Sequence, residues 1–231
     1  MSDDNDELIP ATPTAEEYEA EAKAQAGFAA EDDQGDVFGE EADPMALFKT
    51  WFALASEHEI NDSNAMTLAT VDRDGHPDAR VVLLKDVADG FTFYSNKESA
   101  KGVQLQQNPA ATLLFHWKTI RRQVRIHGDV VVLSDDEADA YFAKRDRGSQ
   151  VGAWASQQSR EMTGSSILNT RIADYEELFA GRDVPRPPFW LGYKLVPKSV
   201  EFWVNRPFRL HDRRLFIRGE DGAWSTSQLY P

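Results

Sequence analysis

The spacing of apolar residues separates a polar N-terminal segment from a patterned remainder. Residues 1–42 are rich in Asp, Glu and Ala and poor in large apolar side chains, which predicts an acidic tail that is disordered in the free protein. Within this tail, Ala15–Ala26 has the composition of a transient helix. We expect order to begin at Asp43-Pro44, an N-cap followed by proline. Apolar residues at helical spacing then predict one amphipathic helix to about His58.

From Ala65 onwards the apolar period shortens to two residues, which is typical of strands. Strands are expected at residues 65–71, 79–85, 91–95, 111–117, 122–133, 190–195, 200–204, 209–217 and 224–228. Further helices are expected at residues 97–107, 134–144 and 167–179. Short strands joined mostly by hairpins, with a few helices, predict a mainly β, α+β domain over residues 43–231, an antiparallel β-barrel decorated with helices.

The net charge of −14 is confined to the tail. Residues 1–43 hold fifteen acidic residues against a single base, Lys23, whereas the remaining residues hold 24 of each sign. The patterned part of the chain is therefore neutral, and we predict that it binds neither nucleic acid nor a membrane surface.

Several kinds of chemistry are excluded by the residues that the chain lacks. It has no cysteine, which rules out disulfides, thiolate nucleophiles and cysteine metal sites. Its five histidines are scattered without ligand spacing, so no metal site is predicted. The glycine motifs of nucleotide-binding folds and the common hydrolase motifs are also missing. No apolar run reaches membrane-spanning length and no signal-peptide pattern opens the chain, which predicts a cytoplasmic protein.

Two segments place cations and hydroxyls beside apolar strands. Arg80 and Lys85 bracket an otherwise apolar run, which fits either charged protection of a sheet edge or contact with two neighbouring anionic groups. Ser95, Ser99 and Lys101 surround the start of the next helix. There they could present hydroxyls and a cation to a phosphate, or simply cap the helix.

A third segment combines a phenol, a guanidinium and a hydroxyl. Tyr141 and Arg145 are four residues apart and are expected on one face of the helix that starts at a Ser134–Glu137 capping box, with Ser149 just beyond that helix. Such a set suits a phosphate monoester, although a solvated helix face is the alternative.

A fourth segment alternates cationic and other residues near the C-terminus. Arg209, His211 and Arg213 are expected to share one face of a strand. Three such side chains repel one another unless an anion or an acid lies among them, so both a bound anion and salt bridges to Asp or Glu remain open.

Taken together, these segments resemble the pyridoxine/pyridoxamine 5′-phosphate oxidases over about residues 43–231. The matching stretches are Arg80–Lys85, Phe93–Asn96, Arg122–Val124, Ser149–Trp154, Gln158-Ser159, Glu201–Trp203 and Arg209–Arg213. The resemblance rests on their order and spacing, because each stretch alone is unspecific.

This resemblance implies a split β-barrel that forms a homodimer and binds FMN at the subunit interface. It implies that FMN-dependent oxidation by O2 converts the phosphorylated B6 vitamers pyridoxine 5′-phosphate and pyridoxamine 5′-phosphate to pyridoxal 5′-phosphate, with H2O2 as the second product. Arg209 and His211 would form the catalytic pair over the reacting carbon. The positions implied to bind the substrate are Lys85, Tyr141, Arg145, Ser149, Arg209 and His211. The positions implied to bind FMN are Arg80, Val81, Val82, Leu83, Leu84, Lys85, Tyr94, Ser95, Lys101, Gln123, Gln158, Ser159, Trp203 and Arg213.

The chain departs from the family pattern at three positions. Ala100 stands where an arginine often precedes the lysine equivalent to Lys101, and Gln228 stands where arginine is usual. Many members have a basic N-terminal arm that carries a tyrosine. In this chain the comparable region is acidic, and only Tyr18 matches that arm. Two other functions are compatible with the same residues. One is a phenazine-pathway-like flavin oxidase of this fold, and the other is a non-catalytic carrier of flavin or pyridoxal phosphate.

Overall fold

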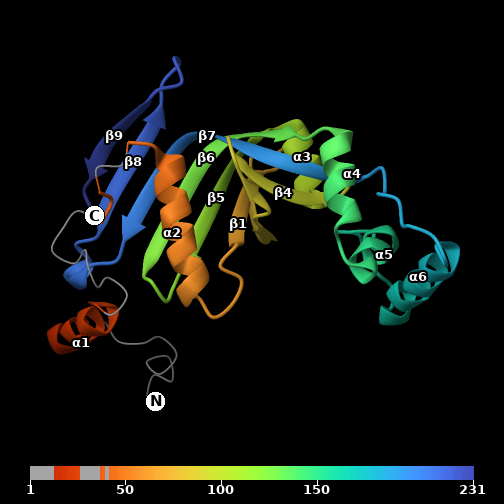
Figure 1. Ribbon diagram of the computed structural model, residues 1–231, viewed down its shortest axis with the longest axis horizontal. Helices are drawn as coiled ribbons and strands as arrows, with labels where there is room; N and C mark the ends of the chain where they lie inside the picture. Colours follow the sequence, from red (N-terminus) through yellow and green to blue (C-terminus); the bar gives the residue numbers. More distant parts are fainter. Residues whose placement is uncertain (1–12, 27–36, 40–41) are drawn as a thin grey trace. The chain divides into compact units, whose positions relative to one another are not determined.

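The computed structural model describes residues 13–26, 37–39 and 42–231 (Figure 1). The chain divides into two compact units that alternate along the sequence. The terminal unit comprises residues 1–63, 116–124 and 201–231, and the central unit comprises residues 64–115 and 125–200.

Antiparallel strands form most of the central unit. Its strands are β1 (Ala65–Val71), β2 (Pro77–Leu83), β3 (Asp86–Val87), β4 (Phe91–Asn96) and the greater parts of β5 (Ala110–Trp117), β6 (Arg122–Val132) and β7 (Trp190–Val204). They pair in the order β2-β1-β5-β6-β7-β4-β3. The β1–β2 hairpin is antiparallel in the register Ala65↔Leu83, and β4 pairs with β7 in the register Phe91↔Leu195. These pairings confirm the predicted antiparallel sheet.

Four helices within the described part of the central unit accompany this sheet. They are α3 (Ala100–Gln107), α4 (Asp135–Ala143), α5 (Arg147–Ala155) and α6 (Ser165–Leu178). The predicted capping box is present at α4. The Ser134 hydroxyl accepts from the Glu137 backbone N–H, and the Glu137 carboxylate accepts from the Ser134 backbone N–H. Phe142, Val151, Phe179, Val184 and Trp190 bury an apolar cluster that joins these helices to the start of β7.

The terminal unit holds α1 (Ala15–Ala26), α2 (Pro44–His58), the short helix η1 (Pro207–Arg209), β8 (Asp212–Arg218) and β9 (Trp224–Leu229). Asp43 caps α2 as predicted, since its carboxylate accepts from the Met45 N–H at 2.9 Å. The buried face of α2 carries Trp51, whose ring meets Phe202 of β7 edge to face at 5.0 Å. Phe202 in turn contacts Phe216 of β8. These aromatic contacts form the core of the unit.

Part of the predicted tail packs onto this core. The Phe38 side chain is only 4% exposed, stacks on Trp51, and lies under the Arg214 guanidinium at 4.7 Å. Arg214 also donates to the Gly39 carbonyl. Val37 and Phe38, which precede the expected start of order at residue 43, are therefore buried against this core. Disorder of the tail as a whole stays a prediction, since residues 1–12, 27–36 and 40–41 lie outside the described residues.

Three predictions about elements were wrong. Helix α5 was not expected, because two glycines and a serine hid its periodicity. Two strands were expected on either side of Pro197, but β7 runs unbroken through this residue. Leu195 and Val200 are fully buried before and after it, and their burial outweighs the one ladder hydrogen bond that proline cannot form. The strand expected at 209–217 instead starts at Asp212.

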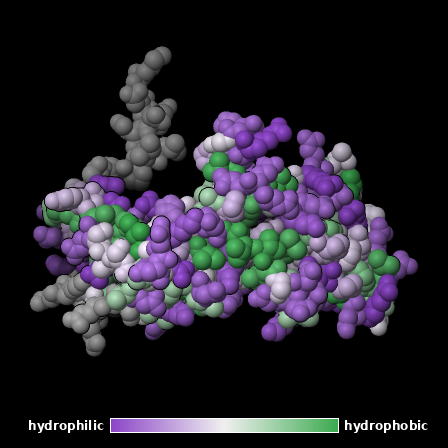
Figure 2. Space-filling model, turned by 90° about the horizontal axis from the view of Figure 1, so that it is seen from above, coloured by the Kyte–Doolittle hydropathy of each residue, from purple (hydrophilic) through white to green (hydrophobic). Residues whose placement is uncertain are grey.

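Exposed apolar side chains remain on the surface. Figure 2 shows one face on which they gather among polar residues. In the central unit, β2 stands at one end of the strand order, and its Val81 and Leu83 side chains are 65% and 39% exposed. An edge strand with exposed apolar residues is a surface that a second chain can cover. None of the helices in the described part of the chain combines the length and hydropathy that a membrane span requires.

Candidate functional site

A cavity of about 490 Å³ in the central unit brings together residues from β2, β4, α3, α4 and α5. Its predicted members are Val81, Val82, Leu83, Lys85, Tyr94, Ser95, Lys101, Tyr141, Arg145, Ser149 and Gln158. Asp146 and Trp190 line it as well, and the sequence reasoning missed both. Three cations thus face one carboxylate, so the cavity favours an anionic ligand.

Lys101 lies in the first turn of α3, which Ser99 caps by accepting from the Gly102 N–H. The lysine side chain is buried, being 7% exposed. Its burial, and next the neighbouring Arg80 guanidinium, lower the pKa of Lys101. A desolvated cation beside a second cation is an unfavourable arrangement that an anion relieves. The alternative role for Ser99 as a helix cap is the one observed.

Arg80 itself does not line the cavity. Its guanidinium donates to the Leu68 carbonyl and the Thr70 hydroxyl, and it pairs with Asp78 at 2.5 Å. Arg80 therefore lies outside the cavity lining, yet its charge acts on Lys101 and adds to the positive potential there. Among the other predicted FMN positions, Leu84 is buried in the core, and Ser159 lines a different hollow together with Asp72 and Asp74.

Aromatic rings fix the position of Tyr141 and Arg145. Tyr141 stacks on Tyr94 with ring centroids 4.0 Å apart, and Tyr94 stacks on Trp190 at 4.9 Å. The Arg145 guanidinium lies 5.0 Å from the Trp190 ring centroid. Gly192 leaves the space for this stack, because a Cβ there would lie 2.8 Å from the Tyr94 ring. The stack orients a phenol and a guanidinium toward the same cavity.

Arg145 follows the end of α4 rather than continuing its face, because the helix stops at Ala143. Burial lowers the pKa of Arg145, and its Nη1 atom is buried without a hydrogen-bond partner among the described residues. Ser149 lies in the first turn of α5, whose N-cap is Asp146. A buried, unsatisfied guanidinium N–H is costly unless a ligand accepts from it.

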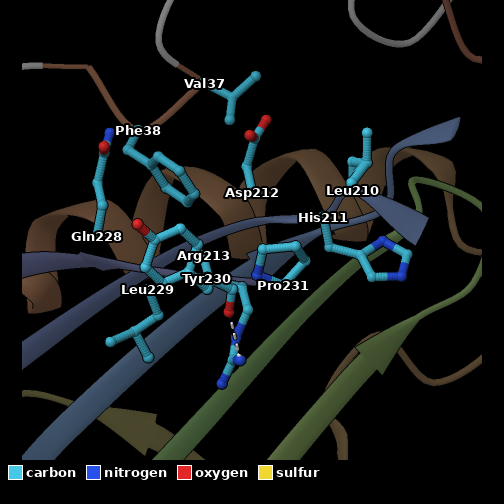
Figure 3. A pocket seen from close by; sticks show the side chains of 10 residues that line it. All are labelled: Val37, Phe38, Leu210, His211, Asp212, Arg213, Gln228, Leu229, Tyr230 and Pro231. Atoms are coloured by element: carbon cyan, nitrogen blue, oxygen red, sulfur yellow. Dashed lines mark hydrogen bonds between the residues drawn. The ribbon is translucent and has the colours of Figure 1, made fainter. Parts of the chain in front are cut away.

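A second cavity, of about 710 Å³, lies in the terminal unit and is lined by His211 and Arg213 among others (Figure 3). Arg213 donates to the Glu201 carboxylate at 2.8 Å and to the Tyr230 carbonyl at 2.9 Å, the bond dashed in Figure 3. The salt bridge that the sequence left open is therefore present at Arg213. Glu201 is buried, so it holds this guanidinium firmly at the cavity wall.

His211 is held from two sides. Its ring lies 4.4 Å from the Trp203 ring, and its Nδ1 atom accepts from the Arg206 backbone N–H at 3.2 Å. Burial first, then the charges of Arg209 and Arg213, lower the pKa of His211. Trp203 and His211, both predicted site residues, are thus brought together.

Arg209 is exposed and belongs to η1, with a φ of 62°. The expected strand face shared by Arg209, His211 and Arg213 is wrong, because only Arg213 lies in β8. Pro207, which lacks an N–H and fixes its own φ, turns the chain here instead of letting it extend. Gln123 lies on β6 in the terminal unit and lines neither of these two cavities.

The predicted residues therefore form two groups, one in each unit. The central group contains the cations and hydroxyls suited to phosphates. The terminal group contains Gln123, Trp203, Arg209, His211 and Arg213. Asp72, Asp74 and His76 form a further polar cluster in the β1–β2 turn, with potential metal-ligand atoms within 4.8 Å of one another. Asp74 and His76 are exposed and Asp72 is half-buried, and exposed acidic groups of this kind are common without a bound ion.

The central cavity fits the phosphate of a flavin mononucleotide on structural grounds. The buried Lys101 ammonium and the Ser95 hydroxyl provide a cation and a donor, and the unsatisfied Arg145 Nη1 offers a second anchoring point for another anionic group. In the sequence, these residues are marked only by the order of several weak motifs. Trp190 could have been found from its aromatic neighbours, but Asp146 carries no signal beyond that of an ordinary helix cap.

Two family models match most of the chain. A family model described as pyridoxamine 5′-phosphate oxidase matches residues 55–179, and one described as the pyridoxine 5′-phosphate oxidase C-terminal dimerisation region matches residues 190–231. The pyridoxine/pyridoxamine 5′-phosphate oxidase of Maricaulis maris is 51% identical over 233 residues, covering all of both chains.

Two solved structures share the fold. PhzG from Burkholderia lata, in complex with tetrahydrophenazine-1-carboxylic acid, has a TM-score of 0.79 and 32% identity, covering 84% of this chain and 96% of its own. An FMN-binding, pyridoxamine 5′-phosphate oxidase-related protein from Nostoc punctiforme has a TM-score of 0.68 at 19% identity, covering 83% of this chain and 100% of its own. The match of two family models across most of the chain, together with a full-length relative at 51% identity, shows that this chain belongs to the pyridoxine/pyridoxamine 5′-phosphate oxidase family.

Proposed function

We propose that this protein is an FMN-dependent oxidase that converts pyridoxine 5′-phosphate and pyridoxamine 5′-phosphate to pyridoxal 5′-phosphate. The alcohol and O2 give the aldehyde and H2O2, whereas the amine also consumes water and releases ammonia. The observation that carries the proposal is the cationic cavity of the central unit, in which Lys85, Lys101 and Arg145 face a single carboxylate. Family membership supports the same reaction.

The substrate phosphate is bound by Arg145 together with Lys85, Tyr141 and Ser149. The Arg145 guanidinium is already oriented by Trp190, and the Tyr141 ring by Tyr94, so little side-chain entropy is lost when the phosphate arrives. Anchoring at the phosphate holds the far end of the vitamer in one orientation. Positioning of this kind supplies a large share of the rate, about 7–11 kcal/mol in favourable cases.

The FMN phosphate is bound by Lys101 and the Ser95 hydroxyl, with Arg80 strengthening the positive potential behind them. When bound, the flavin supplies the two-electron redox chemistry that no side chain provides. The exposed edge of β2, with Val81 and Leu83, offers an apolar surface beside this phosphate position. Ala100 adds no charge to this set, so Lys101 carries more of the affinity for the cofactor.

The protein is a homodimer, and we place the two residue groups in one site that forms across its interface. The family model for the dimerisation region spans residues 190–231, which include Trp203, Arg209, His211 and Arg213. The terminal group of one chain would then face the central group of its partner. In that site Arg209 closes over the substrate ring and His211 contacts the substrate. A cytoplasmic location stays a prediction.

The decisive experiment supplies pyridoxine 5′-phosphate to the purified protein with FMN in air. Equal amounts of pyridoxal 5′-phosphate and H2O2 are expected. Bound flavin without either product would contradict the oxidase and favour a carrier. Turnover of a phosphate-free tricyclic, but not of the vitamer, would favour a reaction like that of the PhzG relative, whose solved structure holds tetrahydrophenazine-1-carboxylic acid.

A further inference from the structure

The segment between β7 and β8 is a loop closed on itself by polar contacts. At its base, the Arg206 guanidinium Nε donates to the Asp212 carboxylate at 2.5 Å. The backbone N–H of Asn205 donates to the Arg121 carbonyl, and that of Leu210 donates to the Pro207 carbonyl. The ion pair therefore joins a residue two positions after the end of β7 to the first residue of β8.

This loop holds a backbone that would not persist by itself. Phe208 and Arg209 are consecutive non-glycine residues with φ of 57° and 62°. The left-handed region is strained for any residue that carries a Cβ atom. Two in succession persist only where the surroundings determine them. The Arg206–Asp212 ion pair is a contact of the right span to do so, because it brackets both residues.

The same loop fixes the proton position on His211. A backbone N–H can only donate, so the Nδ1 atom that receives the Arg206 N–H at 3.2 Å must carry a lone pair. In a neutral ring the proton is then on Nε2. The charges facing the ring are those of Arg209, Arg213 and Asp212, and Trp203 covers it from β7. Burial and the two guanidinium groups lower the pKa of His211, which favours the neutral ring.

We propose that Arg206 and Asp212 are positioning residues that hold His211 as a neutral Nε2–H donor and Arg209 in its left-handed conformation. The assignment rests on the proposed function for the identity of the ligand, which is an acceptor oxygen of the phosphorylated vitamer. It gives His211 a defined role, since a ring that accepts at Nδ1 and carries its proton on Nε2 donates to the substrate and does not take a proton from it.

The tautomer is measured directly in the FMN-bound enzyme labelled with 15N-histidine. Long-range 1H–15N spectra distinguish a protonated ring nitrogen from an unprotonated one, and the resonance missing from the His211→Gln variant identifies His211 among the five histidines. At neutral pH we expect Nε2 protonated and Nδ1 unprotonated. A ring protonated on Nδ1, alone or together with Nε2, would overturn the assignment.

The positioning role is measured with the variants Arg206→Met, Asp212→Asn and Arg206→Lys. Arg206→Met and Asp212→Asn should lower kcat by about 10- to 100-fold and change KM little, because the phosphate anchors lie in the central unit. Arg206→Lys keeps the charge and should recover most of the loss. Arg218→Met, at the other end of β8, is the matched control and should retain activity.

Different outcomes would contradict the positioning role and the proposed function. Unchanged kcat in Arg206→Met and Asp212→Asn, with both proteins folded by circular dichroism, would overturn the positioning role. A loss of kcat without any change in the His211 nitrogen spectrum would also overturn it, because the ion pair would then act on stability alone. A wild-type enzyme that does not oxidise the vitamers would contradict the proposed function, whereas the tautomer would still be read from its spectrum.

Discussion

At the scale of single residues, the central cavity is defined by cations that have lost part of their water. The pKa values of Lys101 and Arg145 are both lowered by burial, and the Arg145 Nη1 atom has no acceptor among the described residues. Such groups reduce the stability of the ligand-free protein, and a bound anion offsets the cost of their desolvation. The cavity is therefore built for phosphates at some cost to the empty protein.

Substitution of Arg145 should separate binding from turnover. Arg145→Ala removes charge-assisted hydrogen bonds worth about 1.5–3 kcal/mol, so KM for pyridoxine 5′-phosphate should rise roughly 10- to 150-fold while kcat falls much less. Steady-state kinetics at saturating FMN provide the measurement. Lys144→Ala removes the neighbouring exposed cation, which does not line the cavity, and should leave KM unchanged. An unaltered KM in Arg145→Ala would exclude its phosphate role.

Substitution of Lys101 should have opposite effects on the cofactor and on the fold. Lys101→Met should weaken FMN binding roughly 10- to 150-fold, measured by quenching of flavin fluorescence. The ligand-free variant should nevertheless be more stable toward urea at neutral pH, because a desolvated ammonium has been removed.

The sign of the pH dependence follows from the direction of the Lys101 shift. The folded-state pKa is below the ordinary value of 10.5, so the unfolded chain binds more protons between the two values. Wild-type stability therefore rises with pH across that window, and the advantage of Lys101→Met shrinks toward pH 10.5. Lys118→Met, at an exposed turn, should show neither effect. Tighter FMN binding by Lys101→Met would refute the assignment.

At the scale of elements, the site depends on how α4 begins and how it ends. Its capping box fixes the start, and the aromatic stack of Tyr141 on Tyr94 fixes the last turn. Arg186 further ties the approach to β7 onto α4 through Asp135 and Asp139. Because Arg145 follows the last residue of α4 by two positions, the position of the helix sets the position of the guanidinium.

Loss of the cap should destabilise this helix without removing a binding group. Ser134→Ala should lower the free energy of unfolding by about 0.5–2 kcal/mol, measured by urea denaturation. The Ser134 hydroxyl and backbone N–H lower the pKa of Glu137 below its ordinary 4.5. That part of the stabilisation is present above pH 4.5 and is lost as the pH falls through the lowered pKa. The difference in free energy of unfolding between wild type and Ser134→Ala should therefore shrink as the pH falls.

Ser227→Ala, which removes an exposed hydroxyl on β9, serves as the control and should be as stable as wild type. Equal stability of Ser134→Ala and wild type would exclude a contribution of the cap.

At the scale of the whole molecule, the predicted site residues are distributed over the two units. The central unit holds the phosphate-binding cations, and the terminal unit holds Trp203, Arg209, His211 and Arg213 within or beside the dimerisation region. If one site draws on the central unit of one chain and the terminal unit of its partner, two defective chains can complete one another. Oligomerisation would then be a requirement for catalysis and not only for stability.

Mixed dimers of two inactive variants provide the test. In a heterodimer of Arg145→Ala and Arg209→Ala chains, one site carries both substitutions and the other carries neither. Random pairing should therefore restore about a quarter of the wild-type activity. Each variant alone should show a high KM or a low kcat, respectively. No recovery after co-refolding, with heterodimers demonstrated by mass, would mean that each site is built within one chain.

The sequence by itself determined the class of fold, the start of α2 and the capping box of α4. These features depend on neighbours along the chain, such as Asp43 with Pro44 or Ser134 with Glu137, and the physical reason that they are readable is that their contacts are local. The order of the polar motifs also led to the family, which the comparisons confirmed.

Only the tertiary structure decided how the site is assembled. It placed Arg80 outside the cavity lining, formed α5 shortly after Arg145 in the chain, and replaced the strand expected at Arg209 by a left-handed loop closed by Arg206 and Asp212. It also packed Phe38 from the acidic tail onto Trp51. Each of these outcomes depends on contacts between residues distant in sequence or on backbone strain that distant contacts stabilise, and periodicity along a chain carries no record of either.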